Sequence, residues 1–226
     1  MSVSRMRVVV TAGPTREHLD PVRFLSNPST GKMGFAVAAE AARRGHEVVL
    51  VAGPVALKTP RGVKRVDVVS AREMLAAATA AVDSAPRFAP LAFVGVAAVA
   101  DWRPRCRAAK KLKKREMSGT LELVRNPDVL KSVGARLRRA GRNDAVLVGF
   151  AAETGSPIAE AVSKCREKRL AFTVANDVAE KGSGFGSDSN RVAFVRADGS
   201  SVRLPLMSKK AVARRIVKEL ETLAGV

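Results

Sequence analysis

Aromatic side chains are scarce in this sequence: they make up 4% of the chain, which has no tyrosine and a single tryptophan, Trp102. Proteins that bind single-stranded nucleic acid stack bases on aromatic side chains, so such stacking platforms are largely excluded. The two cysteines, Cys106 and Cys165, and the two histidines, His18 and His46, show no spacing typical of a zinc site. Two cysteines allow one disulfide at most, which favours a reduced, cytoplasmic setting.

Long apolar runs are also missing, so we expect no membrane span. The first ten residues, MSVSRMRVVV, lead directly into a strand and lack the apolar core of a signal peptide. With 226 residues, 46% of them hydrophobic, the chain can bury a sizeable core. We expect a single α/β domain over residues 1–226.

Acidic residues are outnumbered: 40 lysines and arginines face 21 aspartates and glutamates, for a net charge of +19. This imbalance favours anionic partners by long-range attraction. Nucleic acid and a multiply phosphorylated small molecule are both candidates. No zinc-finger or basic-zipper pattern is present, so we expect no specific nucleic-acid binding.

Apolar strand candidates alternate with helical stretches along most of the chain. The candidates are Val8–Val10, Val48–Ala52, Arg65–Val69, Leu91–Val96, Ala145–Phe150 and Leu170–Ala175, with a late hairpin at Arg191–Val195 and Val202–Leu204. The pattern predicts a Rossmann-like, mostly parallel sheet with helices on both faces, and a ligand cleft where the strand order reverses. Gly119–Val124 is predicted to be an edge strand or a small arm.

The first strand leads through a long polar loop to a helix that begins at Gly31. Backbone N–H groups and the positive end of the helix dipole make such a turn a natural anion site. Two familiar phosphate motifs do not match: Ser26 and Met33 stand where a Walker A loop needs glycine and a hydroxyl residue, and Ser29 replaces a glycine of the dinucleotide fingerprint. The loop is therefore a phosphate-type loop of another design.

Other charged and capping residues follow predicted strands. Asp101 comes after the fourth strand, where open α/β sheets bind ligands. Asn126 and Pro127 are predicted to be the N-cap and first residue of a helix. Lys164 and Lys168 share a helix face that follows a cleft strand.

The most basic run, residues 103–115, has few apolar anchors. It is interpreted as a mobile flap that a triphosphate would neutralise.

These features leave a nucleotide-dependent ligase, a dinucleotide oxidoreductase and a non-catalytic nucleotide-binding protein open. Ala52-Gly53-Pro54 occupies the end of the second strand, where a ribose-binding Asp or Glu is expected in an oxidoreductase. The absence of an acidic residue at these positions makes a dinucleotide oxidoreductase less favoured than the other two classes.

Several ordered motifs resemble one family. The stretch TAGPTREHLDPVRFLSNPSTGKMGFA, followed by AAVADWRP, KLKK, NPDVL, GFAAET, VANDV and FGSDSN, is similar to phosphopantothenoylcysteine synthetase, the phosphopantothenate–cysteine ligase of coenzyme A biosynthesis. One small departure is Thr30, where the family usually has a second serine. A larger departure is that many bacterial members carry a fused N-terminal flavin-dependent decarboxylase domain, which we do not expect in residues 1–226. The resemblance covers nearly the whole chain.

The resemblance implies a two-step reaction. The carboxylate of 4′-phosphopantothenate attacks the α-phosphate of CTP, giving an acyl-cytidylate and pyrophosphate; the amine of cysteine then displaces CMP. The resemblance also implies Mg²⁺, a homodimer, and possible cooperation with a separate decarboxylase. The bacterial CTP-using branch is favoured over ATP by the KLKK and ADWRP motifs.

The resemblance assigns roles residue by residue. Asn27, Lys111 and Arg23 are the implied catalytic residues, and Arg23, Asn27 and Ala98 are the implied substrate-binding residues. The implied nucleotide-binding residues are Gly13, Ser29, Thr30, Gly31, Ala97, Asp101, Lys111, Asn126, Pro127, Asp128, Val129, Phe150, Lys164 and Lys168. Metal ligands stay unassigned, since Mg²⁺ is expected to be held mainly by the nucleotide phosphates.

Overall fold

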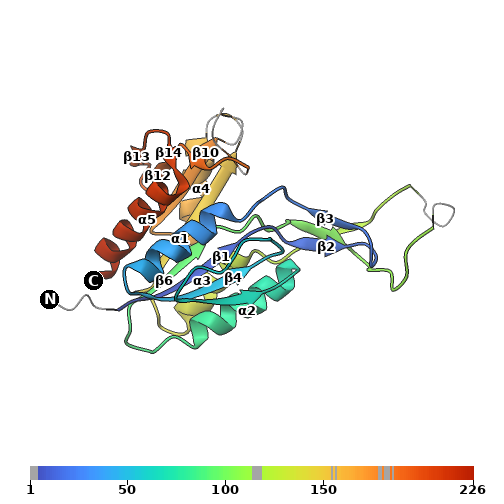
Figure 1. Cartoon of the computed structure of the whole chain (residues 1–226), viewed down its shortest axis with the longest axis horizontal. Helices are drawn as coiled ribbons and strands as arrows, with labels where there is room; N and C mark the ends of the chain where they lie inside the picture. Colours follow the sequence, from blue (N-terminus) through green and yellow to red (C-terminus); the bar gives the residue numbers. More distant parts are fainter. Residues whose placement is uncertain are drawn as a thin grey trace.

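A large, mostly parallel sheet forms the centre of the molecule (Figure 1). The computed structural model describes residues 5–113, 119–153, 155, 157–177, 180, 184 and 186–226. The sheet strands, in spatial order, are β13 (Ser201–Arg203), β12 (Ala193–Val195), β10 (Phe172–Asp177), β9 (Val146–Glu153), β6 (Leu91–Gly95), β1 (Arg7–Ala12), β4 (Glu47–Ala52) and β5 (Val63–Asp67). β12 pairs antiparallel with both β10 and β13, and the other neighbouring pairs are parallel. The chain builds outward from β1 to β5 and then continues on the other side of β1, so the strand order reverses between β1 and β6, as predicted.

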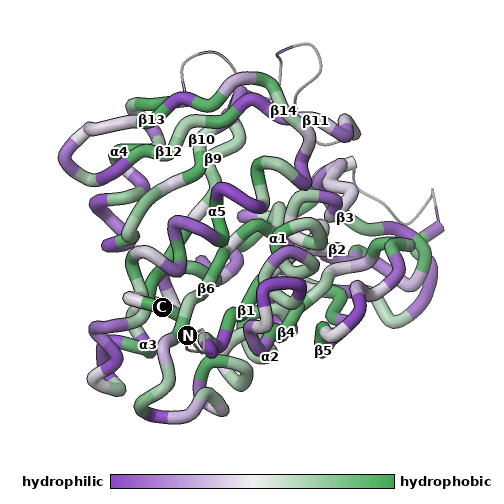
Figure 2. Tube along the Cα trace, turned by 60° about the vertical axis from the view of Figure 1, so that its left-hand side comes forward, coloured by the Kyte–Doolittle hydropathy of each residue, from purple (hydrophilic) through white to green (hydrophobic). Residues whose placement is uncertain are grey.

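Helices cover both faces of the sheet. The helices are α1 (Lys32–Arg43), α2 (Ala71–Asp83), α3 (Val129–Arg139), α4 (Pro157–Lys168) and α5 (Lys209–Ala224). α1 and α5 lie together on one face, and α2 and α3 lie on the other (Figure 1). In Figure 2, α5 alternates between hydrophilic and hydrophobic residues, as expected of a helix that covers a sheet.

Successive valines of β1 enter opposite cores. Val8 and Val10 pack in one buried cluster with Val37 of α1 and Ile216 of α5. Val9 packs in the other, which includes residues of α2, α3 and α4. A strand buried on both faces needs apolar residues at every position, which explains the uninterrupted valine run.

The small residues of α1 allow it to approach β1 closely. A Cβ added to Gly34 would lie 2.5 Å from the Cβ of Ala12, closer than packed carbon atoms tolerate. Gly31 precedes the helix with φ 77°, a left-handed conformation that favours glycine. The helix therefore begins directly beside the end of β1.

Short strands form an arm that projects from the sheet (Figure 1). One ribbon pairs β2 (Arg16–His18) with β3 (Phe24–Ser26), and another pairs β7 (Trp102–Pro104) with β8 (Leu123–Arg125). The predicted Gly119–Val124 strand is therefore wrong at its start, since only its last two residues join β8. In a separate two-stranded sheet, β11 (Ser189–Asn190) pairs with β14 (Met207–Ser208).

Several local predictions can be compared directly with the structure. Ser70 caps α2, its Oγ accepting the backbone N–H of Glu73, as the capping box predicts. The third strand begins at Val63, two residues earlier than predicted, because it continues its pairing with β4. Thr154 and Ser156, the predicted caps of α4, lie outside the described residues.

Candidate nucleotide and substrate cleft

A cleft of about 450 Å³ opens at the carboxyl ends of β6 and β9. It brings together eleven of the residues assigned from the sequence, which come from separate loops, strands and helices. They are Asn27, Ala97, Ala98, Asp101, Asn126, Pro127, Asp128, Val129, Phe150, Lys164 and Lys168. The volume lies within the range of small-molecule sites in proteins.

The loop after β6 forms one wall of this cleft and is tied to the loop after β1. The N–H of Ala98 donates to the carbonyl of Gly13 at 2.9 Å. The carbonyl of Ala98 in turn accepts the Asn27 side-chain Nδ2 at 3.0 Å. Because one Asn27 amide hydrogen is used in this way, its Oδ1 and second hydrogen remain for polar groups in the cleft.

Buried Thr15 supports the same loop from behind. Its Oγ1 accepts the N–H of Ala100 at 3.0 Å, and its side chain is fully buried. Sequence reasoning assigned Thr15 no role, although it lies within the most characteristic motif. Its hydroxyl matters because it satisfies a backbone N–H of the loop, at Ala100.

The predicted capping role of Asn126 is wrong. Its Nδ2 donates to the carbonyl of Ala100 at 2.8 Å, so the side chain bonds the loop after β6 instead of capping the helix. The N-cap of α3 is Asp128, whose Oδ1 accepts the N–H of Lys131 at 2.9 Å. Pro127 accordingly precedes the helix, which begins at Val129.

Two lysines of α4 provide positive charge on the opposite wall. Lys168 Nζ lies 2.6 Å from Asp128 Oδ2, and Lys164 Nζ donates to the carbonyl of Phe150 at 3.1 Å. Burial lowers the pKa of Lys164, and the nearby charge of Lys168 lowers it further. Burial alone would raise the pKa of Asp128, but the Lys131 N–H and the Lys168 ammonium outweigh it and lower that pKa. An incoming phosphate would favour the charged form of Lys164.

The glycine turn before α1 lines a smaller hollow that adjoins the cleft. Four assigned residues, Gly13, Ser29, Thr30 and Gly31, lie there and not in the main cleft. The two share the side chains of Val96, Phe150 and Ala152. Lys209, which sequence reasoning missed, also lines this hollow; it is buried, and its Nζ donates to the carbonyl of Gly184 at 2.8 Å. Together they form one elongated site with positive groups at both ends.

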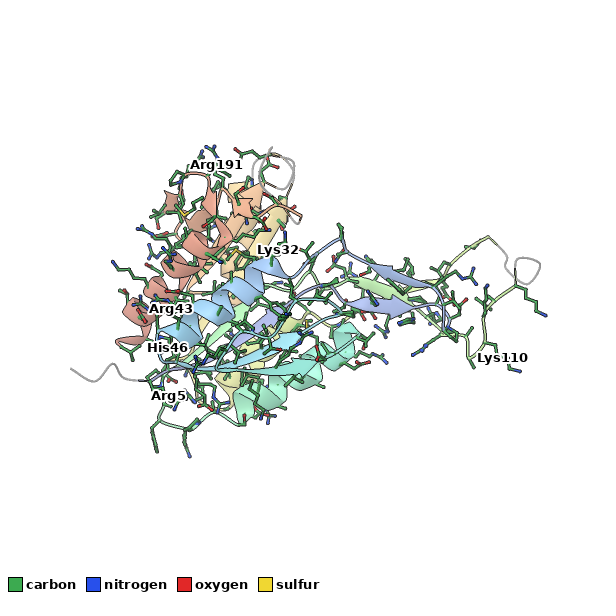
Figure 3. The ribbon with its side chains drawn as sticks, viewed as in Figure 1. Arg5, Lys32, Arg43, His46, Lys110 and Arg191 are labelled. Atoms are coloured by element: carbon green, nitrogen blue, oxygen red, sulfur yellow. The ribbon has the colours of Figure 1, made fainter. Side chains whose placement is uncertain are left out.

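Two assigned catalytic residues lie on the arm and not in the cleft. Arg23 follows the β2–β3 turn, and its Nη2 donates to the carbonyl of Leu112 at 2.8 Å. Lys111 therefore lies beside Arg23 in the chain fold, while Figure 3 shows its neighbour Lys110 at the far end of the arm. The structure thus brings Arg23 close to the Lys111 segment but separates both from the residues that line the cleft.

Carboxylates of the cleft are the candidates for metal binding. In residues 5–113 and the later described segments, no group of three or more Asp, Glu, His or Cys could hold a metal ion by itself. Mg²⁺ commonly needs only one or two carboxylates when substrate phosphates supply further oxygens. Asp101 and Glu153 both line the cleft and fit that requirement; Glu153 is a second residue that sequence reasoning missed.

Fold and site together define a Rossmann-like α/β protein with an elongated, cationic cleft at the reversal of strand order. The sequence pattern of the DNA/pantothenate metabolism flavoprotein C-terminal domain matches residues 3–223, and the chain belongs to this family. No helix in the described part of the chain is long and apolar enough to cross a membrane.

Curated relatives are bifunctional proteins of coenzyme A biosynthesis. The chain is 44% identical over 223 residues to the CoaBC protein of Escherichia coli K12, covering 97% of this chain and 52% of that protein. It is 42% identical over 218 residues to CoaBC of Bacillus subtilis 168, covering 96% and 51%. The chain thus spans about half the length of these relatives.

Solved structures show the same fold. The C-terminal domain of a CoaBC protein superposes with a TM-score of 0.78 at 40% identity, covering 98% of both chains. The H337A mutant of Cab2, in complex with phosphopantothenate-cysteine, superposes with a TM-score of 0.72 at 16% identity, covering 98% of this chain and 88% of Cab2.

Proposed function

We propose that this chain is a phosphopantothenate–cysteine ligase, which joins 4′-phosphopantothenate to L-cysteine at the expense of CTP. The observation that carries the proposal is the convergence of eleven assigned residues on one cleft. Those residues were selected from motifs spread over the chain, and the fold alone does not require them to meet. The identity to CoaBC proteins over nearly the whole chain supports the same activity.

The first step forms a mixed anhydride. A carboxylate oxygen of 4′-phosphopantothenate bonds to the α-phosphorus of CTP, and the bond to pyrophosphate breaks. Lys164 and Lys168 offset the charge of the triphosphate, and Asn27 donates toward an oxygen of the acyl phosphate. Such charge stabilisation and positioning are the main tools of an enzyme in phosphoryl-type transfers.

The second step forms the amide. The cysteine amine attacks the activated carbonyl carbon, CMP leaves, and the nitrogen loses a proton. The elongated shape of the site suits this order of steps, because the glycine turn and Lys209 offer a second anion-binding subsite beyond the nucleotide end. Mg²⁺, held by the nucleotide phosphates with Asp101 or Glu153, would neutralise charge on the leaving pyrophosphate.

The arm supports a homodimer as the active form. Lys111 is assigned to the triphosphate, yet it does not line the cleft of its own chain, and its neighbour Lys110 lies at the far end of the arm. We infer that the arm of one subunit delivers Lys111 and Arg23 to the cleft of its partner, in an isologous pair. A decarboxylase is expected to consume the product, and the expected setting is the cytoplasm.

A coupled pyrophosphate-release assay tests the proposal. With CTP, 4′-phosphopantothenate and cysteine we expect pyrophosphate, CMP and the amide product, each confirmed by mass spectrometry. Omitting cysteine should leave pyrophosphate release limited to one turnover per site. Nucleotide binding without pyrophosphate release would instead indicate a non-catalytic nucleotide-binding protein.

The same assay compares nucleotides. We expect a higher kcat/KM with CTP than with ATP. Equal values, or a preference for ATP, would contradict the assignment to the CTP-using branch. A DNA mobility-shift experiment at physiological salt should show no complex, whatever the net charge.

A further inference from the structure

A fully buried aspartate lies at the turn of the arm hairpin, outside the cleft. Asp20 follows β2 and has no exposed surface. Its Oδ1 accepts the backbone N–H groups of Val22 and Arg23, both at 2.8 Å. These two bonds form an Asx-type turn, which fixes the backbone of the hairpin.

The second oxygen of Asp20 joins two segments that are far apart in sequence. Oδ2 accepts Arg23 Nε at 3.0 Å and Nη2 at 2.6 Å, and also the backbone N–H of Leu112 at 3.2 Å. The carbonyl of Leu112 accepts the same Arg23 Nη2 at 2.8 Å. Both backbone polar groups of Leu112 are therefore held by this pair of side chains, and Leu112 stands between Lys111 and Lys113.

A buried carboxylate is costly unless it is fully hydrogen-bonded. Asp20 meets that condition with five hydrogen bonds, three of which come from Arg23. Burial alone would raise the pKa of Asp20, but the bonds from Arg23, Val22 and Leu112 outweigh it and lower that pKa well below 3.8. The carboxylate thus stays ionised throughout the physiological range.

We propose that Asp20 is a positioning residue, which locks Arg23 and the Lys111–Lys113 backbone into one rigid unit. The role rests on the proposed function of Arg23 and Lys111. Preorganisation matters here because a lysine on a loose segment must be ordered at each turnover. The surrounding run is rich in charge and poor in apolar anchors, so this clasp replaces a hydrophobic core as the means of ordering it.

Asp20→Asn tests the clasp, because the amide nitrogen cannot accept hydrogen bonds from Arg23 or Leu112. Two readouts are measured. We expect faster tryptic cleavage after Lys110, Lys111 and Lys113, and a loss of about 10–100-fold in kcat for acyl-cytidylate formation, with little change in KM for cysteine. The matched control is Asp144→Asn, which breaks an exposed aspartate–arginine pair with Arg142 outside the arm. It should change neither readout.

Two further variants make the test decisive. Asp20→Ser keeps a hydroxyl acceptor for the turn but lacks the second oxygen that accepts from Arg23 and Leu112. It is used in place of Asp20→Asn if that variant does not fold. In a Lys111→Gln background, Asp20→Asn should cause a smaller additional loss of kcat than it causes in wild type, because part of its effect acts through Lys111 and the rest through Arg23.

The outcomes separate the two proposals. A folded Asp20 variant with wild-type cleavage and wild-type kcat overturns the positioning role, as does faster cleavage with unchanged kcat. Full additivity with Lys111→Gln overturns it as well. If wild-type protein forms no acyl-cytidylate, the proposed function fails and the positioning role fails with it, while the cleavage rates still decide whether the clasp exists.

Discussion

The cleft and the arm are built on different physical principles. The cleft lies at the ends of β6 and β9, strands that are buried between two apolar cores. Its side chains are positioned by a rigid sheet, and backbone bonds such as Ala98 N–H to Gly13 hold its loops. The arm has short two-stranded ribbons and exposes Phe24, Trp102 and Leu123. Its order depends on polar contacts, above all the bonds of Asp20.

This contrast separates two requirements of the proposed reaction. The nucleotide must be held in one orientation, which suits a site on a rigid scaffold. A group that closes over phosphates must arrive after the substrates, which suits a projecting element that another subunit can present. The exposed apolar residues on the arm offer a surface that the proposed dimer would cover.

The largest expected effect falls on the cleft. Asn27→Asp places a carboxylate oxygen against the carbonyl of Ala98, which now accepts the Asn27 amide. It also adds negative charge beside an acyl phosphate. We expect a loss of about 10³-fold in amide formation, in line with removal of a preorganised donor. The melting temperature should stay close to that of wild type, and near-normal turnover would refute the assigned role.

On the arm, Lys111→Gln is expected to lose about 10²–10³-fold in acyl-cytidylate formation. Lys110→Gln is the matched control, since it removes the same charge one residue away. Its loss should be much smaller if Lys111 contacts the phosphates specifically. Equal losses in the two variants would mean that the arm acts only as a diffuse electrostatic attractor.

Mixing the two inactive variants tests whether cleft and arm belong to different subunits. After subunit exchange, half of the dimers contain one Asn27→Asp chain and one Lys111→Gln chain. Delivery of the arm to the partner leaves one intact site in each mixed dimer, so about one quarter of wild-type activity should return. If each chain uses its own arm, mixing restores nothing.

The lowered pKa of Lys164 predicts how CTP affinity depends on pH. Burial disfavours the charged form of Lys164 and lowers its pKa from the ordinary value of 10.5. The ammonium therefore loses its proton at a lower pH than an exposed lysine does. Bound phosphates favour the charged form, so CTP affinity should fall as the pH rises through the lowered pKa. Calorimetric titrations across alkaline pH measure the effect. Lys164→Arg, which stays charged, should flatten this dependence even if its overall affinity is weaker.

The smallest expected effects are on the free energy of unfolding, which should change more for a substitution beside the sheet than for one on the arm. Gly34→Ala forces a methyl group onto Ala12, and we expect about 1–3 kcal/mol of destabilisation in urea unfolding. Leu123→Ala on the arm removes a side chain that is 39% exposed, and we expect a change within about 0.5 kcal/mol for the isolated subunit. A large effect of Leu123→Ala would indicate that the arm is buried in the dimer.

Sequence alone determined the features that depend on local patterning. The valine run of β1, the capping box at Ser70 and the glycine turn at Gly31 each follow from short-range rules, and the structure confirms them. The order of strands and helices also identified the fold and the edge of the sheet that carries the cleft. These predictions succeed because periodicity and backbone preference act over a few residues.

Only the tertiary structure decided which long-range partner each polar side chain meets. Asn126 is a residue type that often caps helices, yet its side chain donates to the carbonyl of Ala100, and Asp128 caps the helix instead. Asp20 and Leu112 are separated by 92 residues, so no local pattern links them. The motif assigned Lys111 to the site, whereas its neighbour Lys110 lies at the far end of the arm (Figure 3) and Lys111 is not among the residues that line the cleft. A polar group is satisfied by whichever donor or acceptor the fold brings within about 3 Å, and that choice belongs to the whole chain.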